Sequence, residues 1–261
     1  MENLRKIYCV DIGNTRTHCA LVAFDGSAYS ALESSDFPSA GFAEIFTRLR
    51  LFESSGADAL SWCSVVPARS EEFARAARAE GCRAMRLTHE NSPIEIDMKN
   101  PAQLGHDRIA GAVGAAIFFE PPYISVDMGT AVTVDLVDSR GRYAGGAIAP
   151  GMHAFASYLA ERAAQLPSIN PADADFDLVI GRDTAEAMYV GCAKGFCKLA
   201  DGIISDIERE YFPRGDIASK TVFTGGSVDL LPKKWLAGRK IESNLSALGL
   251  ARSYILNEEK Q

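Results

Sequence analysis

Five residues near the amino terminus, Asp11-Ile12-Gly13-Asn14-Thr15, decide how the rest of this chain is interpreted. The apolar run Lys6–Val10 precedes them, a second run, Thr17–Phe24, follows them, and both have the pattern of β-strands. A polar turn with a glycine between two such runs predicts a β-hairpin. Because glycine has no Cβ, the backbone of this turn can approach an anion closely. Its amides and the Thr15 hydroxyl are therefore candidate ligands for phosphate oxygens.

A related hairpin is predicted in the second half of the chain. Tyr123–Val126 and Val132–Val137 have the pattern of strands, and the turn Asp127-Met128-Gly129-Thr130 lies between them. Aligning the two hairpins sets Asp11 on Asp127, Gly13 on Gly129 and Thr17 on Thr133, and leaves Leu21-Val22 one position out of step with Leu136-Val137. Agreement of this kind over about fifteen positions indicates a duplicated lobe.

Composition limits the class of protein. The chain has 261 residues, roughly 1.7 times a usual domain length, which does not decide between one large domain and two modest ones. With 47% hydrophobic and 23% charged residues, it has ample material for a folded core. The net charge of −7 argues against broad binding to nucleic acid or to anionic membranes. A local basic cleft for an anionic ligand is still compatible with this balance.

The location of the protein is predicted from what the sequence lacks. No run approaches the roughly 18 apolar residues needed to cross a bilayer, and no signal-peptide core precedes the first strand, so we expect a cytoplasmic protein. The six cysteines contain no CxxC pair, which favours reduced thiols in or near the core.

The remaining hydrophobic patterns predict an α/β fold in which strands and helices follow one another. Expected helices cover Phe42–Phe52, Ser70–Gly81 with Ser70 as its N-cap, Asp107–Phe119, Met152–Gln165, Asp183–Tyr211 and Asn244–Leu256, and further strands cover Ala57–Val66 and Lys220–Phe223. The two hairpins then divide the chain into two homologous lobes, 1–118 and 119–261.

The duplicated turns together predict a nucleotide site. One such turn alone is more often an ordinary Asx-type turn, and no Gly-Lys precedes Ser or Thr, so this is not a P-loop. Two such turns facing across a cleft can hold a polyphosphate from both sides. A carboxylate beside phosphate requires a bridging cation, because the like charges repel. The pair therefore predicts a metal–nucleotide site with Asp11 and Asp127 as its carboxylates.

The segment Gly105-His106-Asp107-Arg108 stands directly before a predicted helix. Asp107 could be a simple helix cap, with Arg108 as its ion-pair partner. In a kinase, Asp107 would instead accept the proton of the attacking hydroxyl, and Arg108 would neutralise carboxylate or phosphoryl charge through its bidentate fork. Taken alone, this segment leaves both interpretations open.

Glycines also stand in Gly145–Gly151, between a predicted strand and a predicted helix, and in Thr224-Gly225-Gly226-Ser227 after a strand. Each segment is either a plain connection or a place where a ligand approaches the backbone, and the second suits a flat purine ring. In Gly181–Thr184, Asp183 or Thr184 is expected to cap a helix. The histidines form no recognisable metal-ligand set: His18, His89, His106 and His153.

Six motifs occur in one order along the chain: DIGNT at 11–15, NPAQLGHDR at 100–108, DMGTAVTVD at 127–135, GGAIAPGM at 145–152, GRDTAEAM at 181–188 and TGG at 224–226. In these motifs, and in length, the chain resembles the type III pantothenate kinases, which belong to the superfamily of acetate and sugar kinases, Hsp70 and actin. The resemblance implies an α/β fold of two RNase-H-like, actin-like ATPase lobes with mixed sheets. It also implies a homodimer and the ATP-dependent phosphorylation of pantothenate, the first step towards coenzyme A.

The resemblance also implies roles for particular residues. The first phosphate loop would be Asp11, Ile12, Gly13, Asn14, Thr15, Arg16, Thr17 and His18, with Asp11 near Mg²⁺. Asp127 would bind a monovalent cation, K⁺ or ammonium, Thr130 would contact ATP, and Gly225 and Gly226 would lie near adenosine. The pantothenate site would include Met98, Gly105, His106, Asp107 and Arg108, with Asp107 as the base. Thr184 would reach the substrate from the partner subunit, so that the active site lies at the dimer interface.

Two residues depart from the pattern of that family. Met98 stands where a tyrosine is common, and His106 replaces the small alanine of the family's GADR motif. Both changes concern the acceptor pocket, so a related hydroxy acid or amide is an alternative acceptor. A nucleotide-binding regulatory homologue without kinase turnover is an alternative of another class. Such a protein has no chemical need for the base Asp107.

Overall fold

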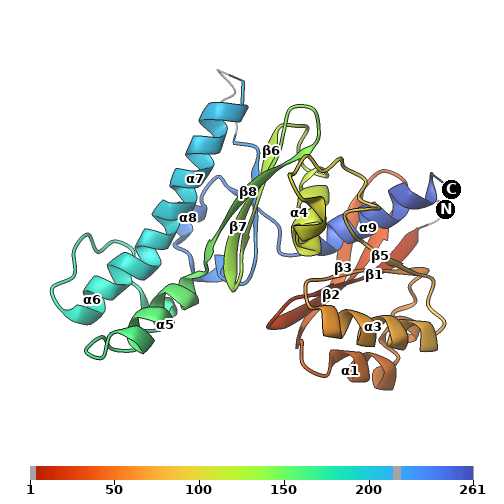
Figure 1. The fold of residues 1–261 in the computed structure, drawn as a ribbon, viewed down its shortest axis with the longest axis horizontal. Helices are drawn as coiled ribbons and strands as arrows, with labels where there is room; N and C mark the ends of the chain where they lie inside the picture. The colour runs from red at the N-terminus through yellow and green to blue at the C-terminus, as the bar shows by residue number, and fades with distance from the viewer. Residues whose placement is uncertain (1–3, 214–218, 261) are drawn as a thin grey trace. The chain divides into compact units, whose positions relative to one another are not determined.

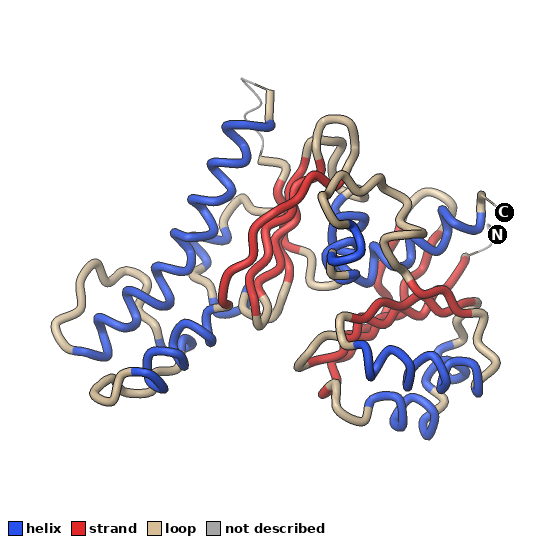
Figure 2. Tube along the Cα trace, viewed as in Figure 1, coloured by secondary structure: helices blue, strands red, loops and turns tan. Residues whose placement is uncertain are grey.

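The structure is a computed structural model that describes residues 4–213 and 219–260 (Figures 1 and 2). The chain divides into two compact units. The first comprises Met1–Pro121, Arg140–Ala144 and Asn244–Gln261, and the second comprises Pro122–Ser139 and Gly145–Ser243. This division differs from the predicted boundary after residue 118, because the carboxy-terminal helix packs with the first unit.

The first unit is built on a five-stranded mixed sheet with the order β3-β2-β1-β4-β5. β1 pairs antiparallel with β2 and parallel with β4. Its elements are β1 (Arg5–Ile12), β2 (Arg16–Phe24), β3 (Tyr29–Pro38), α1 (Phe42–Leu49), α2 (Leu51–Ser55), β4 (Ala59–Ser64), α3 (Pro67–Ala79), β5 (Ala84–Arg86), the 3-10 helix η1 (Pro101–Gln103), α4 (His106–Ala115) and α9 (Leu245–Glu258).

Helices cover both faces of this first sheet (Figure 1). On one face α1 and α3 bury an aromatic cluster that Phe46, Phe73 and Trp62 form, with Phe73 edge-on to both other rings. On the other face lie α4 and α9. A strand covered on both faces is apolar along its whole length, which is why Ile7–Val10 has no polar alternation.

The second unit is built on a sheet of the same size with the order β10-β9-β6-β7-β8. Its elements are β6 (Tyr123–Met128), β7 (Ala131–Val137), β8 (Tyr143–Pro150), α5 (Met152–Arg162), the 3-10 helix η2 (Pro171–Asp173), α6 (Thr184–Tyr189), the π-helical turn η3 (Val190–Lys194), α7 (Gly195–Tyr211), β9 (Thr221–Thr224), the 3-10 helix η4 (Val228–Leu230), α8 (Lys233–Leu236) and β10 (Lys240–Ile241). β8 begins at Tyr143 in the first unit and continues into the second. Helices α5 and α7 contact β7.

The two sheets have one topology. β6 pairs antiparallel with β7 and parallel with β9, as β1 does with β2 and β4. Both predicted hairpins are therefore confirmed, and the observed strand orders agree element by element. The architecture is α/β with two mixed sheets, as predicted.

The register corrects one detail of the alignment of the hairpins. Asp11 lies opposite His18, and Asp127 lies opposite Thr133, so Thr133 is equivalent to His18 and not to Thr17. Beyond the turn, Val22 pairs with Ile7 and Val137 pairs with Tyr123, which are equivalent positions. The second turn is one residue shorter, and this deletion accounts for the residues that were one position out of step.

Three local predictions were wrong. Helix α3 begins at Pro67, because proline is compatible with the first helical position, and Ser70 lies inside the helix, where its hydroxyl donates to the Val66 carbonyl. The predicted helix Phe42–Phe52 breaks at Arg50, which has a positive φ of 45° and separates α1 from α2. The glycine-rich segment before Gly151 is an edge strand, β8, in which glycines are tolerated.

The cysteines agree with the prediction of free thiols in or near the core. All six cysteines are free, and all but the half-buried Cys82 are buried. Within residues 4–213 and 219–260, no helix is both long enough and apolar enough to cross a membrane.

Glycines set the distance between α4 and α9. A Cβ on Gly249 would overlap the Ala110 carbonyl oxygen and lie 2.8 Å from the amide nitrogen of Gly114. A Cβ on Gly114 would overlap the Leu245 carbonyl oxygen in the same way. The two helix backbones are therefore in direct contact, and this contact holds the carboxy-terminal helix in the first unit.

We expect Gly249→Ala to lower the free energy of unfolding by about 1–3 kcal/mol, because the added methyl group must push two backbones apart. Thermal unfolding followed by circular dichroism measures the change. The control is Gly202→Ala in α7, where a Cβ would meet nothing within 4 Å. That variant should be unchanged or stabilised by up to about 1 kcal/mol through helix propensity. Equal melting temperatures for the two variants would contradict the close packing.

Candidate functional site

The first predicted phosphate turn is closed by a backbone hydrogen bond. The Gly13 amide donates to the Arg16 carbonyl at 3.0 Å, and a Cβ on Gly13 would lie only 2.8 Å from that oxygen. Glycine is thus required for this closure. Asp11 and Ile12, which the sequence suggested as part of the turn, are the last residues of β1.

Two residues that the sequence analysis did not identify hold this turn in place. The Ser39 hydroxyl donates to the Gly13 carbonyl at 2.8 Å, and the Ser39 amide donates to the Thr15 carbonyl at 3.1 Å. Arg69, from α3, donates to the Asn14 carbonyl at 2.9 Å. The carbonyl groups of the turn are therefore tied back to the body of the unit. No sequence signal links these residues to the turn, since only the fold brings them near.

Asp11 lies half-buried at the end of the central strand. The Cys63 thiol of β4 donates to its Oδ1 at 3.3 Å, and Ser246 also hydrogen-bonds to it. Burial raises the pKa of Asp11, and the hydrogen bonds and the nearby His18 oppose that rise only in part. An ionised Asp11 therefore gains from a bound cation that replaces the lost hydration.

Asp107 is positioned at the first turn of α4. Its Oδ1 accepts a hydrogen bond from the Arg108 amide at 2.8 Å and lies over Gly105, where a Cβ would be 2.5 Å from the carboxylate oxygen. The glycine of this motif therefore makes room for the carboxylate. Burial raises the pKa of the Cys63 thiol, and the negative charges of Asp11 and Asp107 raise it further. The structure thus places both carboxylates near the Cys63 thiol. The sequence analysis did not predict this proximity.

His106, the residue before Asp107, is half-buried. Its Nδ1 is buried and has no hydrogen-bond partner among the described residues. Burial lowers the pKa of His106, and the positive charge of Arg86 lowers it further. A backbone hydrogen bond to Ser64 partly offsets this. A buried nitrogen without a hydrogen-bond partner is costly, so it marks His106 as a position that requires an explanation beyond packing.

Arg108 and the segment that carries Met98 meet at a residue that the sequence analysis missed, Tyr143. The Arg108 guanidinium lies 5.9 Å from the centre of the Tyr143 ring. The Tyr143 backbone forms a bridge with Ile96, and its carbonyl accepts from the Asp97 amide at 2.9 Å. Met98 follows directly and is half-buried.

His18, the last residue of the predicted loop, lies in β2 rather than in the turn. One ring nitrogen bonds to the Asp36 carboxylate and the other to the Asn244 side-chain amide, both at 3.0 Å. The amide can present either its oxygen or its nitrogen, depending on the imidazole tautomer. These contacts connect β2 with the start of α9.

The second turn, in the other unit, is enclosed by glycines. The Gly129 amide donates to the Ala131 carbonyl at 3.0 Å, and the Gly151 amide donates to the Thr130 carbonyl at 3.0 Å. A Cβ on Gly151 would lie 2.6 Å from the Thr130 carbonyl oxygen. The end of β8 therefore packs directly on this turn. Asp127, at the end of β6, is exposed.

Gly225 packs against the same carboxylate. Its φ is +94°, and a Cβ would overlap the Asp127 Oδ1 and lie 2.6 Å from the Met128 backbone. The Ser227 amide donates to the Met128 carbonyl at 2.9 Å. Gly226 is exposed, and a Cβ there would meet nothing within 4 Å. The structure thus brings Asp127, Gly129 and Gly225 to one end of the second sheet, as their spacing alone did not show.

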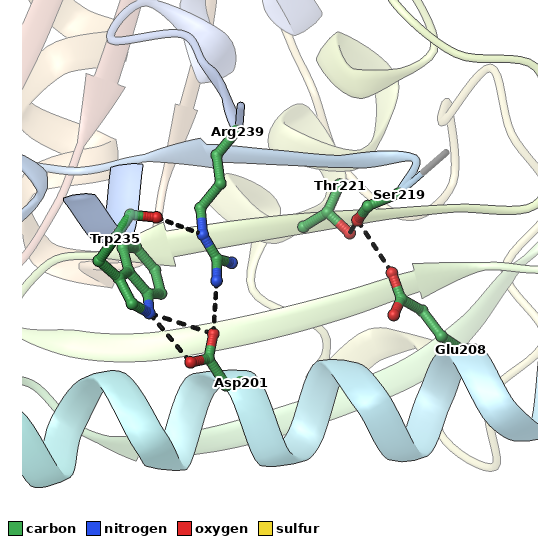
Figure 3. A network of polar contacts seen from close by, with 6 residues as sticks. All are labelled: Asp201, Glu208, Ser219, Thr221, Trp235 and Arg239. Carbon is green, nitrogen blue, oxygen red and sulfur yellow. Dashed lines mark hydrogen bonds and ion pairs between the residues drawn. The ribbon is translucent and has the colours of Figure 1, made fainter. Parts of the chain in front are cut away.

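A polar network supports β9, the strand that leads into Gly225 (Figure 3). Asp201 of α7 accepts from the Trp235 indole at 3.0 Å and from the Arg239 guanidinium at 2.7 Å. That guanidinium lies over the Trp235 ring at 3.8 Å and over the Phe223 ring at 5.0 Å. Phe223 belongs to β9, so the network fixes this strand against α7.

Thr184 lies at the first position of α6 and is exposed. The cap of this helix is Asp183, whose carboxylate accepts from the Glu186 amide at 2.8 Å. Thr184 is therefore not needed as a cap. Gly181 packs against the backbone of α6, where a Cβ would lie 2.5 Å from the Cα of Ala187.

The side chains near Asp11 fit a metal ion that is held mainly by the phosphates of a bound nucleotide and by only one or two protein carboxylates. In the described part of the chain, no three His, Cys, Asp or Glu side chains gather as a metal-binding group. Mg²⁺ usually keeps several waters and is held by one or two carboxylates together with substrate phosphates. The desolvated Asp11 carboxylate meets that requirement, since a cation would relieve the cost of its burial.

Comparison with known proteins identifies the family. A family model described as type III pantothenate kinase matches residues 7–206. This chain belongs to the type III pantothenate kinase family. It is 35% identical over 190 residues to the type III pantothenate kinase of Rhodospirillum centenum, covering 72% of each chain. It is 37% identical over 176 residues to that of Akkermansia muciniphila, covering 67% of this chain and 69% of the other.

Solved structures confirm the fold that the family resemblance predicted. A conserved Campylobacter jejuni protein assigned to the Baf family of transcriptional activators has a TM-score of 0.63 at 19% identity, over 97% of this chain and 99% of that one. The activator of a Clostridium difficile 2-hydroxyisocaproyl-CoA dehydratase has a TM-score of 0.52 at 12% identity, over 98% and 96% of the two chains. The actin-like ATPase fold predicted for the pantothenate kinase family is thus present in this chain.

We expect Gly225→Ala to lower the melting temperature, because the substituted residue must adopt a left-handed backbone and displace the Asp127 carboxylate. The left-handed backbone alone costs about 1–2 kcal/mol. The matched control is Gly226→Ala, which has open space at its Cβ. Differential scanning fluorimetry without nucleotide should show a loss for the first variant and a value close to that of the unaltered protein for the second. A similar decrease in melting temperature in both variants would contradict the role of the contact between Gly225 and Asp127. It would show that any side chain in the Gly225-Gly226 turn destabilises the protein.

Proposed function

We propose that this protein transfers the γ-phosphoryl group of ATP to pantothenate, forming 4'-phosphopantothenate as the first step towards coenzyme A. The observation that carries the proposal is the match of residues 7–206 to the type III pantothenate kinase family. That span contains Asp11, Asp107 and Asp127. In the first unit, Asp11 and Asp107 both act electrostatically on the Cys63 thiol, and a cation held by such carboxylates would neutralise the charge of the phosphoryl group.

In this proposal Asp107 acts as the base. Phosphoryl transfer has a loose transition state, so most of the catalysis comes from alignment and charge neutralisation. Asp107 would orient the hydroxyl of pantothenate and accept its proton. Arg108 would bind the pantothenate carboxylate or the transferring phosphoryl group through its guanidinium. Gly105, His106 and Met98 would form the rest of the acceptor site.

ATP and a divalent cation would be bound by the two hairpin turns. The residues from Asp11 to His18 would surround the phosphates, and Asp11 would hold Mg²⁺, which supplies charge neutralisation when bound. Thr130 would contact ATP, and Gly225 and Gly226 would lie near adenosine. Asp127 would hold a monovalent cation, K⁺ or ammonium, since its carboxylate is exposed beside the turn at Gly129.

We expect Asp107→Asn to reduce kcat by about 10²–10⁴, the range typical of a lost general base, while ATP binds nearly as before. Asparagine keeps the oxygen that accepts from the Arg108 amide, so the start of α4 should remain intact. Release of ADP with and without pantothenate measures turnover, with K⁺ present or omitted. The control is Asp206→Asn, an exposed carboxylate on α7. Unchanged turnover in Asp107→Asn would remove Asp107 from the role of base.

The same assay separates the alternatives. A regulatory homologue would bind ATP but release no ADP with any acceptor, and the Campylobacter jejuni protein of similar fold carries a name of that kind. The relatives from Rhodospirillum centenum, Akkermansia muciniphila and Streptomyces avermitilis are all named as kinases, which favours turnover. ADP release with a related hydroxy amide but not with pantothenate would show that Met98 and His106 have changed the acceptor.

We further propose that the protein forms a homodimer through its second unit. The four most exposed large hydrophobic side chains in the described residues all belong to this unit, at 60–75% exposure: Ile148, Tyr158, Val179 and Ile180. A protein–protein contact would bury apolar side chains of this kind if they form one patch. Thr184 follows Val179 and Ile180 closely and is exposed, so it would complete the pantothenate site of the partner subunit.

Mixing two inactive variants tests the shared site. Asp107→Asn and Thr184→Ala chains, unfolded and refolded together, should recover about a quarter of full activity. This is because half of the dimers are mixed and each mixed dimer has one intact site. The control mixture of Asp107→Asn with Asp11→Asn should recover none, since both residues belong to one chain's site. Equal recovery in both mixtures, or none in either, would contradict a contribution of Thr184 from the partner.

A further inference from the structure

The first unit contains a cavity that none of the proposed catalytic or binding residues lines. It has a volume of about 710 Å³ and lies between α3 and the strands β4 and β5. Three arginines line it: Arg75 and Arg78 from α3, and Arg86 from the end of β5. Pockets of this volume accommodate small organic molecules.

The charge in this cavity is unbalanced. Arg75 and Arg78 take part in none of the ion pairs of the described residues, and one carboxylate, Glu71, lies in the lining. Arg75 lies one helical turn after Glu71, and Arg78 one turn further, so all three occupy one face of α3. Several arginines that line one cavity favour an anion there, because each guanidinium presents several N–H donors in a planar fork.

Two contacts fix the position of the Arg86 side chain in the cavity. Its guanidinium lies over the Trp62 ring at 5.1 Å, and one of its nitrogens donates to the Ser70 hydroxyl at 3.4 Å. Stacking on an indole fixes the plane of a guanidinium and lowers the entropy lost when it binds an anion. Among the described residues the Ser70 hydroxyl is the one hydrogen-bond partner of the exposed Arg86 guanidinium, so its remaining N–H groups can donate to a ligand oxygen.

The rest of the lining is apolar. Ala74 and Ala77 from α3, Ala84 from β5 and the Cys82 side chain form this part, together with Trp62. The lining therefore combines a cationic part with an uncharged part. A simple inorganic anion would use only the first, whereas an organic anion would use both.

We propose that this cavity binds the phosphate monoester group of a small organic molecule, with the phosphate on Arg75, Arg78 and Arg86 and the organic part against the alanines. Two sources of this chemistry differ in the organic part: a nucleoside monophosphate and a phosphorylated pantothenate-like chain. The inference does not depend on the proposed catalytic residues.

Fluorescence of Trp62 tests the proposal in the full-length protein. The chain has two tryptophans, Trp62 and Trp235, so Trp235→Phe makes the emission specific for the cavity. AMP and 4'-phosphopantothenate are titrated separately. At least one should change the emission in a saturable way, because binding alters the guanidinium stacked on the indole. The ester with the lower dissociation constant shows whether the cavity prefers a nucleoside monophosphate or a phosphorylated pantothenate-like chain. If neither ester causes a saturable change, the proposal is overturned.

Variants separate binding in the cavity from binding elsewhere. The double substitution Arg75→Ala with Arg78→Ala should raise the dissociation constant about tenfold or more. This is the effect expected when charge-assisted hydrogen bonds are lost. The control, Arg48→Ala with Arg209→Ala, removes two exposed arginines from other helices and should leave it unchanged. Ala74→Leu fills the cavity without changing its charge and should also weaken binding of the ester. This variant provides the test if the arginine double variant has a lower melting temperature and is therefore destabilised. Binding by both altered cavities equal to the control would overturn the proposal.

Discussion

The end of the central strand in each sheet carries an aspartate, and the arrangement of the predicted site depends on it. Asp11 and Asp127 occupy equivalent positions in the two units, each directly before a turn that a glycine amide closes. Burial raises the pKa of Asp11, so its ionised form is costly in the free protein. A cation and the phosphates it carries would relieve that cost, which makes the binding of a metal–nucleotide complex favourable at this position.

Contacts that require glycine hold the surroundings of these aspartates. Gly225 lies against the Asp127 carboxylate, Gly105 lies under the Asp107 carboxylate, and Gly249 sets α9 directly on α4. A side chain at any of these positions would overlap a backbone or carboxylate atom. Close packing alone therefore explains two of the motif glycines, Gly105 and Gly225, before any contact with a ligand is considered.

Much of the site could be predicted from sequence because its residues lie in short segments with local signals. The Asp-x-Gly hairpins were found in this way, as was the Gly-His-Asp-Arg segment at the start of α4, and the functional roles of their residues stay predictions. Ser39, Cys63, Arg69 and Tyr143 were missed. Each contacts a motif from a distant part of the chain, and a pattern read along the sequence contains no information on such pairs.

The sequence by itself determined the two hairpins, the duplication and the family, because strand alternation, turn chemistry and motif order are local properties. The tertiary structure decided the register of the second hairpin, the strand at Gly145–Pro150 and the membership of α9 in the first unit. It also decided which side chains surround Asp11, and it formed the arginine-lined cavity beside Trp62. These features depend on which surfaces pack together, and packing is settled only when distant segments bury their apolar faces against one another.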